Sequence, residues 1–535
     1  MGIGARVALE LKHSNEHQLL PFAVFRTKMN APRELHLGEL RFADFTQPMP
    51  ASKRAALIQS LRDILPAQDI LTTDEALRPY ECDGLAGYRQ MPSVVVLPTQ
   101  ESQVVEILKL AHRLDVPVVA RGAGTGLSGG ATPHRGGLIL SLARLNTIVS
   151  IDPAARTARV RPGVRNAAIS DAAAPYGLYY APDPSSQIAC SIGGNVAENS
   201  GGVHCLKYGL TVHNVLRIRG VTIEGEIVEF GSEALDAPGL DLLSLVIGSE
   251  GMLSVVTEVT VKLIPKPQLA RVIMASFDNV EKSGQAVANL IAAGIIPAGL
   301  EMMDQKMTRA VEEFVHAGYD LQAKAILLCE SDGTPEEVEE EIGRMKTVLS
   351  DSGATDLKVS ETEEQRLRFW SGRKNAFPAA GRVAADYYCM DGTIPRAKLG
   401  EMLNRIAEME IKYGLACMNV FHAGDGNLHP LILFDASKPG EFHQAELFGA
   451  EILESCVEYG GTVTGEHGVG LEKINSMCVQ FSPQERIAFF AVKRGFDPAG
   501  LLNPGKAIPT LSRCAEYGKM HVHRGALKFP ELPRF

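Results

Sequence analysis

The chain has 535 residues and a formal net charge of −10 at pH 7. An acidic chain lacks the basic surface that contacts phosphate backbones, so we expect no nucleic-acid partner. Hydrophobic residues make up 45% and charged residues 22% of the chain, values typical of a globular protein. The length allows about two or three domains. No apolar run reaches the roughly 18 residues that a membrane-spanning helix requires.

The N-terminal segment has no regular pattern. Residues 1–50 are expected to form an irregular arm. Charged and polar residues interrupt the first 28 positions, where a secretory signal peptide would be apolar. Met29 is therefore a candidate start of translation, and whether the preceding segment is made is left open.

A β-α-β unit follows, and it ends in a glycine-rich loop. Apolar strands at 93–97 and 116–121 enclose a helical pattern at 103–114. Gly124–Gly129 matches the dinucleotide motif G-x-G-x-x-G, but the chain then enters another strand at 138–142 instead of a helix. A Walker loop is excluded because no Lys-Ser/Thr pair follows the last glycine. The pattern favours a strand–loop–strand cradle whose backbone N–H groups contact phosphates.

Two further glycine-rich loops, at 182–202 and 248–253, are also bounded by apolar strands. Each alone is ordinary turn chemistry. Together with the first loop they suggest one long ligand, held by backbone groups within a domain expected over residues 51–266. The residues expected to bind this cofactor are Arg121, Gly122, Gly124, Thr125, Gly126, Ser128, Gly129, Pro182, Asp183, Ser191, Gly193, Gly194, Asn195, Asn199, Gly201, Glu250, Val256 and Asn503.

The segment Pro265-Lys266-Pro267 marks the expected start of a second domain, residues 267–510. Strands there alternate with long helices, which predicts an α+β domain covering the cofactor. The expected strands are 271–277 and 325–330, and the expected helices are 280–292, 335–349, 399–413 and 442–459.

His422 and His429 flank an Asp-Gly-Asn turn between two apolar strands. A hairpin folded there would bring the two imidazoles face to face. Glu466 would complete a set of two nitrogens and one oxygen, typical of a catalytic metal ion with an open coordination position. His467 would then remain as an acid or base. Histidine pairs are more often structural, and that alternative stays open.

These motifs resemble a known superfamily over roughly residues 55–510. The glycine loops resemble the FAD-binding domain of the vanillyl-alcohol oxidase (PCMH) type, and the His/Glu segments resemble the C-terminal domain of its D-2-hydroxyacid dehydrogenases. Residues 78–84, 182–208 and 386–395 are most similar to the FAD-linked D subunits of bacterial glycolate oxidases. The resemblance implies an α+β fold, with a two-part FAD domain and an α+β cap. It also implies non-covalent FAD, because Leu127-Ser128-Gly129 stands where some relatives carry a flavin-linked histidine.

The activity implied is FAD-dependent oxidation of a small 2-hydroxyacid, with glycolate to glyoxylate favoured. A D-lactate dehydrogenase linked to quinone or cytochrome, and a non-catalytic scaffold that holds FAD, are the alternatives. A divalent metal ion (Zn, Mn or Fe) on His422, His429 and Glu466 would activate the hydroxyl, and His467 would remove its proton. Arg373 would bind the substrate carboxylate, unless it is a plain surface arginine.

The resemblance also implies limits on substrate and partners. Phe377, Cys389 and Leu431 replace polar residues that hold the second carboxylate of D-2-hydroxyglutarate in relatives, so a monocarboxylic acid is favoured. Nine dispersed cysteines without a C-x-x-C pair indicate no iron–sulfur cluster and a reducing cytoplasm. Electrons would then leave through a second FAD-domain subunit and an iron–sulfur subunit at the inner face of the cell membrane. The tail, 511–535, is rich in basic residues and is expected to be solvated or to dock a partner.

Overall fold

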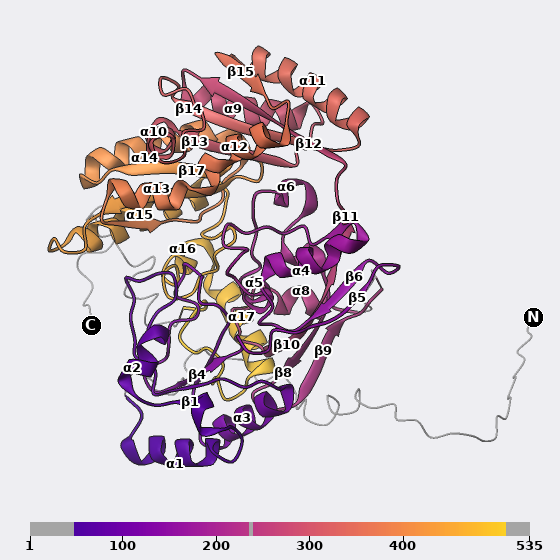
Figure 1. Ribbon diagram of the computed structural model, residues 1–535. Coiled ribbons are helices and arrows are strands. Elements are labelled where there is room, and N and C mark those ends of the chain that lie inside the picture. The colour runs from indigo at the N-terminus through magenta and orange to yellow at the C-terminus, as the bar shows by residue number, and fades with distance from the viewer. Residues whose placement is uncertain (1–47, 235–238, 510–535) are drawn as a thin grey trace, which may run out of the picture. The chain divides into compact units, whose positions relative to one another are not determined.

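The computed structural model describes residues 48–234 and 239–509. The tail expected at 511–535 and nearly all of the arm expected at 1–50 lie outside these residues. The described residues all belong to one compact unit, in which helices and sheets are mixed as the predicted α+β fold requires (Figure 1). Among the described helices, none combines the length and the apolar character needed to cross a membrane.

The first sheet has four strands in the order β1-β2-β4-β3. Strand β3 runs parallel to β4, and β4 runs parallel to β2, as expected for the β-α-β unit. Helix α3 buries Val104, Ile107 and Leu108 in the core of this sheet. The elements are α1 (Ala51–Leu61), β1 (Ile70–Leu71), β2 (Val94–Val96), α3 (Glu101–Arg113), β3 (Val118–Arg121) and β4 (Leu138–Ser141).

The second sheet has five antiparallel strands in the order β5-β6-β10-β8-β9. Its core packs against α4 and α5, which lie on the segment between β6 and β8. Strands β7 and β11 pair with each other in a separate, short antiparallel sheet. The elements are β5 (Ile148–Asp152), β6 (Thr157–Val160), α4 (Asn166–Ala173), β7 (Leu178–Tyr179), α5 (Ile192–Glu198), β8 (Val215–Val221), β9 (Ile227–Gly231), β10 (Val255–Lys262) and β11 (Ile264–Pro265).

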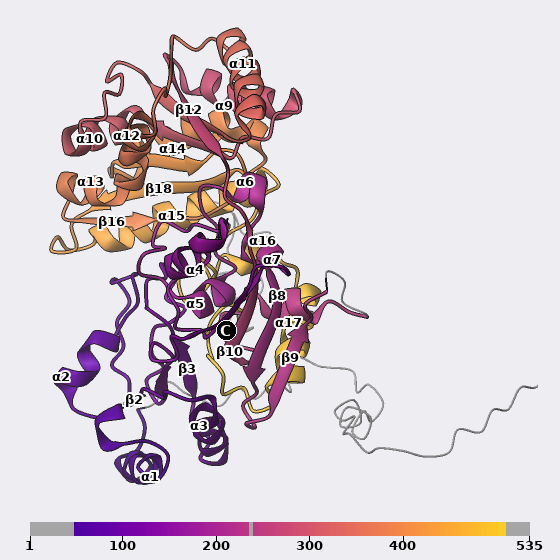
Figure 2. The same cartoon turned by 45° about the vertical axis from the view of Figure 1, so that its right-hand side comes forward.

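The third sheet has seven strands in the order β15-β12-β14-β13-β17-β18-β16, all antiparallel. Helices cover both of its faces, as Figures 1 and 2 show. One face carries α9 (Val280–Ala292), α11 (Pro335–Asp351), α14 (Leu399–Tyr413) and α15 (Glu441–Glu458). The other carries α10 (Gln305–Val315), α12 (Glu363–Lys374) and α13 (Ala376–Val383). The strands are β12 (Leu269–Phe277), β13 (Gly299–Asp304), β14 (Ala325–Gly333), β15 (Asp356–Val359), β16 (Asp386–Cys389), β17 (Cys417–His422) and β18 (Asn427–Phe434).

The chain returns to the first two sheets after the seven-stranded one. Helix α17 (Pro483–Phe496), yellow in Figures 1 and 2, lies beside β8 and β10 and contributes to the core of the five-stranded sheet. Leu502 then pairs with Val118, so the chain forms a parallel bridge beside β3. Most of the domain predicted as 267–510 therefore forms the seven-stranded sheet and its helices. Its last segment packs against the first two sheets instead and supports the glycine loops. The sequence analysis pointed to this return only through Asn503, which was expected to bind the cofactor together with the glycine loops.

Candidate active site

The glycine loops surround a cavity of about 410 Å³. Its wall also includes residues from the far end of the chain, among them His429, Glu466 and His467. The predicted cofactor residues that line it are Arg121, Gly122, Gly124, Thr125, Gly126, Ser191, Gly193, Gly194, Asn195, Glu250 and Val256. The cofactor loops and the His/Glu segments thus share one cavity.

The loop after β3 and the first turn of α5 approach their neighbours so closely that glycine is required. A Cβ atom on Gly122 would lie 2.1 Å from the hydroxyl of Ser191, and one on Gly193 would lie 2.6 Å from the ring of Pro162. Ser191 caps α5 by accepting a hydrogen bond from the Gly194 N–H. Backbone groups rather than side chains therefore form this part of the wall.

The other predicted cofactor residues, Ser128, Gly129, Pro182, Asp183, Asn199, Gly201 and Asn503, do not line the cavity. Several of them support its loops instead. The Asn503 amide donates to the carbonyls of Gly130 (3.1 Å) and Glu250 (2.7 Å), which joins the C-terminal segment to two loops. The Pro182 carbonyl accepts a hydrogen bond from the Asn166 amide.

Glu250 lines the cavity and also fixes the segment after His467. Its carboxylate accepts hydrogen bonds from the N–H groups of Val469 (2.7 Å) and Gly470 (2.8 Å). Burial raises the pKa of this carboxyl despite these two bonds. One side chain thereby holds one of the glycine-rich loops against the segment that carries Glu466 and His467.

The predicted hairpin forms between β17 and β18. Its register pairs His422 with Asn427 and Val420 with His429, so the two histidines are diagonal neighbours on one face. Their ring centroids are 5.0 Å apart. Gly426, at φ +80°, allows the turn and donates to the His422 carbonyl.

Glu466 joins the two histidines as predicted. Its Oε1 lies 3.1 Å from Nε2 of His422 and 2.9 Å from Nε2 of His429. One donor atom from each of the three lies within 4.8 Å of the other two. Burial raises the pKa of Glu466, but the two imidazoles outweigh burial and hold it well below its usual range.

The outer nitrogens of both imidazoles have acceptors of their own. Nδ1 of His422 lies 2.7 Å from Oε1 of Glu301, and Nδ1 of His429 lies 3.4 Å from the Met390 carbonyl. These acceptors suit a proton on each Nδ1, so that each Nε2 would be available to a metal ion. Burial lowers the pKa of His422, but Glu301 and Glu466 outweigh burial and raise it well above 6.5, so its Nε2 donates a hydrogen bond to Glu466. Sequence reasoning missed Glu301, because its strand, β13, is distant in sequence from the hairpin.

His467 lies on the other side of His429. The two rings are nearly parallel, with centroids 5.0 Å apart and planes 11° apart. Burial lowers the pKa of His467 to about 4, so its imidazole is neutral near pH 7. Its Nδ1 is buried and has no hydrogen-bond partner among the described residues. A neutral imidazole of this kind is able to accept a proton.

Asp391, which the sequence did not single out, holds the segment that carries Glu466 and His467. Its carboxylate accepts hydrogen bonds from the backbone N–H groups of Glu466 (3.1 Å) and His467 (2.9 Å) and lies 3.4 Å from the ammonium group of Lys473. Both Asp391 and Lys473 are fully buried. The Asp-Gly pair just after β16 was the sequence feature from which Asp391 could have been identified.

Arg373 is placed beside the cluster but not in the cavity wall. The side chain is buried, forms an ion pair with Glu301 at 2.5 Å, and lies 3.5 Å from Nδ1 of His422. Its neighbour Lys374 is exposed and lines the cavity. The expectation of a plain surface arginine does not hold for this position.

The three positions expected to restrict the substrate to monocarboxylic acids lie close together in the fold. Phe377 lines the cavity and packs edge-on against Tyr387, with ring centroids 5.8 Å apart. Cys389 and Leu431 are directly paired across β16 and β18 and are buried behind it. This side of the site is therefore apolar.

Comparison with known proteins agrees with this arrangement. The family described as "FAD binding domain" matches residues 92–231, and "FAD linked oxidases, C-terminal domain" matches residues 266–507. The glycolate oxidase subunit GlcD of Escherichia coli (strain K12) is 62% identical over 91% of this chain and 98% of that protein. The chain belongs to the FAD-linked oxidase family.

More distant relatives share the architecture. A D-lactate dehydrogenase of Anaerostipes hadrus is 32% identical over 84% of this chain and 96% of that protein. A crystal structure of p-cresol methylhydroxylase with substrate bound superposes with a TM-score of 0.73 at 18% identity, covering 87% of this chain and 98% of that one. This fold likeness confirms the predicted PCMH-type α+β fold.

FAD is the cofactor of this family, and the cavity suits it. The loops present backbone groups of Gly122, Gly124 and Gly194 to the cavity. The Ser254 hydroxyl also lines the cavity and has no hydrogen-bond partner among the described residues. A long ligand rich in phosphate and ring acceptors matches such a wall.

Proposed function

We propose that this chain is the catalytic FAD subunit of a glycolate dehydrogenase and oxidises glycolate to glyoxylate. The observation that carries the proposal is that His429, Glu466 and His467 line the same cavity as the glycine loops. The 62% identity to the E. coli glycolate oxidase subunit supports the substrate. A D-lactate dehydrogenase is the second candidate, supported by the 32% identity to that enzyme.

We assign His422, His429 and Glu466 to a divalent metal ion, either Zn, Mn or Fe. The convergence of two Nε2 atoms on one carboxylate supports the assignment, and so do the acceptors beside each Nδ1. When bound, such an ion supplies a Lewis acid that lowers the pKa of a coordinated hydroxyl group. A purely structural histidine pair remains the alternative.

The chain's own residues perform the remaining tasks. The substrate carboxylate is drawn to the positive charge of Lys374 on the cavity wall. Arg373, beside His422, would bind it only in exchange for its ion pair with Glu301. His467, neutral near pH 7, accepts the hydroxyl proton. When bound, FAD supplies the acceptor for the two electrons that leave the substrate carbon together with its hydrogen.

The apolar side of the site supports a small acid with one carboxylate. A second carboxylate against Phe377 would lose its water without gaining a partner, at a cost of a few kcal/mol. A methyl group there changes binding by only about 1–3 kcal/mol, so glycolate and D-lactate are separated less sharply. We further propose that FAD is bound non-covalently, because Leu127 lines the cavity where a linking histidine would stand.

Partners complete the proposed reaction. The relative's name identifies GlcD as a subunit, and a subunit without an iron–sulfur motif needs a partner to pass electrons onward. We propose a second FAD-domain subunit and an iron–sulfur subunit, with the assembly at the inner face of the cell membrane. A scaffold that only holds FAD is less consistent with a complete His/Glu cluster in the cavity.

Anaerobic mixing of the purified chain with each acid, followed by flavin absorbance, tests the proposal. Glycolate should bleach the flavin fastest, D-lactate next and D-2-hydroxyglutarate slowly. Phe377→Ala should improve D-lactate relative to glycolate, whereas Phe314→Ala, an exposed phenylalanine on α10, should not change the ratio. If no acid reduces the flavin, the scaffold alternative replaces the catalytic one. If D-2-hydroxyglutarate is fastest, the substrate assignment is wrong.

A further inference from the structure

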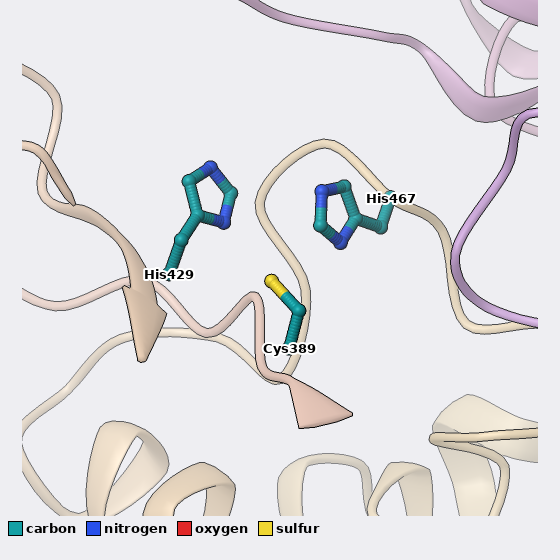
Figure 3. A group of neighbouring side chains, drawn as sticks. All are labelled: Cys389, His429 and His467. Carbon is teal, nitrogen blue, oxygen red and sulfur yellow. The ribbon is translucent and has the colours of Figure 1, made fainter. Parts of the chain in front are cut away.

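A second group of metal-ligating side chains overlaps the first. Cys389 at the end of β16, His429 in β18 and His467 each place one donor atom within 4.8 Å of the other two. Figure 3 shows the sulfur of Cys389 directed toward the space between the two imidazole rings. The group consists of one sulfur and two nitrogens, whereas the proposed catalytic group has two nitrogens and one carboxylate oxygen.

The surroundings leave these donors available. Cys389 and His429 are buried, and within the part of the chain that the structure describes the Cys389 thiol has one weak hydrogen bond, at 3.4 Å, to the carbonyl of its neighbour Met390. Nδ1 of His467 is buried without a partner among the described residues. Because His429 and His467 line the cavity, an ion reaches this group from the cavity side.

The two groups differ in the softness of their ligand atoms and therefore in the ions that they prefer. Thiolate sulfur selects Zn²⁺ and softer ions, whereas a carboxylate with imidazoles also accepts Mn²⁺ and Fe²⁺. Both groups contain His429, so an ion bound with Cys389 and His467 shares an imidazole with the catalytic group.

We propose that Cys389, His429 and His467 form a second, inhibitory site for thiophilic ions such as Zn²⁺ or Cd²⁺. Binding replaces the thiol hydrogen of Cys389 with the ion and releases one proton to solvent. It engages His467, the proposed base, together with His429, whose imidazole also belongs to the catalytic group. The binding step is independent of the proposed function, whereas the inhibition rests on it.

X-ray absorption at the zinc edge tests the binding step directly. FAD-loaded, chelator-treated protein is mixed with less than one equivalent of Zn²⁺. A bound sulfur gives a distance of about 2.3 Å, longer than the roughly 2.0–2.1 Å of zinc–nitrogen bonds. The sulfur signal should persist in His422→Asn, which disrupts only the catalytic group, and should vanish in Cys389→Ala.

Cys329→Ala is the matched control, because Cys329 is also fully buried but lies on β14 outside both groups. It should keep the sulfur signal. A His422→Asn protein whose bound zinc has no sulfur neighbour would overturn the proposal, whether or not the chain oxidises glycolate.

Inhibition provides the second readout. In the presence of glycolate, Cys389→Ala should raise the Zn²⁺ concentration for half-inhibition by at least the roughly tenfold that loss of an outer partner of a metal site causes. Cys329→Ala should leave it unchanged. Equal zinc sensitivity of the Cys389→Ala and unmodified proteins would also overturn the inhibitory role.

Discussion

The two walls of the cavity are built on opposite principles. On the flavin side, the loops near Gly122 and Gly193 present backbone, and a single added Cβ would collide with a neighbour. On the opposite side, His429, from a fully buried antiparallel hairpin, and Glu466 and His467 present side chains. One wall depends on the absence of side chains, whereas the other depends on the identity of a few.

This difference predicts what a substitution in each wall impairs. A change on the backbone wall moves a loop and weakens cofactor binding, because there is no side-chain chemistry to lose. A change on the side-chain wall leaves the fold intact, because strands hold the remaining groups, but it removes a specific reaction step. The variants below separate these two kinds of failure.

The largest effect is expected from His429→Ala. Loss of Lewis-acid assistance removes several kcal/mol of transition-state stabilisation, a decrease in flavin reduction of roughly four orders of magnitude. Metal content should fall while FAD remains bound, as measured by elemental analysis and flavin absorbance. His443→Asn, at a histidine whose side chain is 67% exposed on α15, should behave like the unmodified protein. Full activity in a metal-free preparation would contradict the assignment.

His467→Asn should have the next largest effect. Loss of the base slows anaerobic flavin reduction by roughly two to four orders of magnitude. FAD should remain bound, and metal at His422, His429 and Glu466 should be retained. Stopped-flow absorbance measures the rate. A rate close to that of the unmodified protein would assign the base to another residue.

Gly193→Ala tests the backbone wall. The new Cβ would meet the rigid ring and backbone of Pro162, and overpacking of this kind costs about 1–3 kcal/mol. We expect FAD to bind roughly ten- to hundredfold more weakly, with little change in the metal content. Fluorescence titration of the flavin measures the affinity. Gly343→Ala on α11, where a Cβ meets nothing within 4 Å, is the control and should not alter FAD binding.

The last prediction concerns stability and His204, which joins the second glycine loop to the seven-stranded sheet. Its Nδ1 lies 2.7 Å from Asp183 and its Nε2 lies 3.1 Å from Glu330 of the seven-stranded sheet. Burial lowers the pKa of His204, but these two carboxylates outweigh burial and raise it well above 6.5. The charged imidazole therefore contributes stability that is fully present below about pH 6.5 and is lost as the pH rises through the raised pKa.

His204→Gln should lower the free energy of unfolding by about 1.5–3 kcal/mol near pH 6. The difference from the unmodified protein should shrink as the pH becomes alkaline, as measured by denaturant unfolding at several pH values. His112→Gln, at an exposed position on α3, should change neither value. A difference that is independent of pH would show that His204 is not charged in the folded protein.

The site could be predicted from sequence where it depends on local spacing. The turn between His422 and His429 sets the hairpin register, and the register alone places both rings on one face. The glycine loops were likewise visible, because strand and turn residues alternate over short distances. Helices such as α9 and α14 were predicted at Val280–Ala292 and Leu399–Tyr413, as observed, because their apolar periodicity is long.

The sequence by itself determined the family, the α+β fold, the three glycine loops and the hairpin that carries His422 and His429. Only the tertiary structure decided that Glu301 orients His422, that Asp391 holds the backbone of Glu466 and His467, and that the segment at Leu502 closes the sheet beside β3. These contacts join residues far apart in sequence. Local spacing carries no information about such contacts, because they arise when separate hydrophobic cores pack together and bring distant polar groups to one cavity.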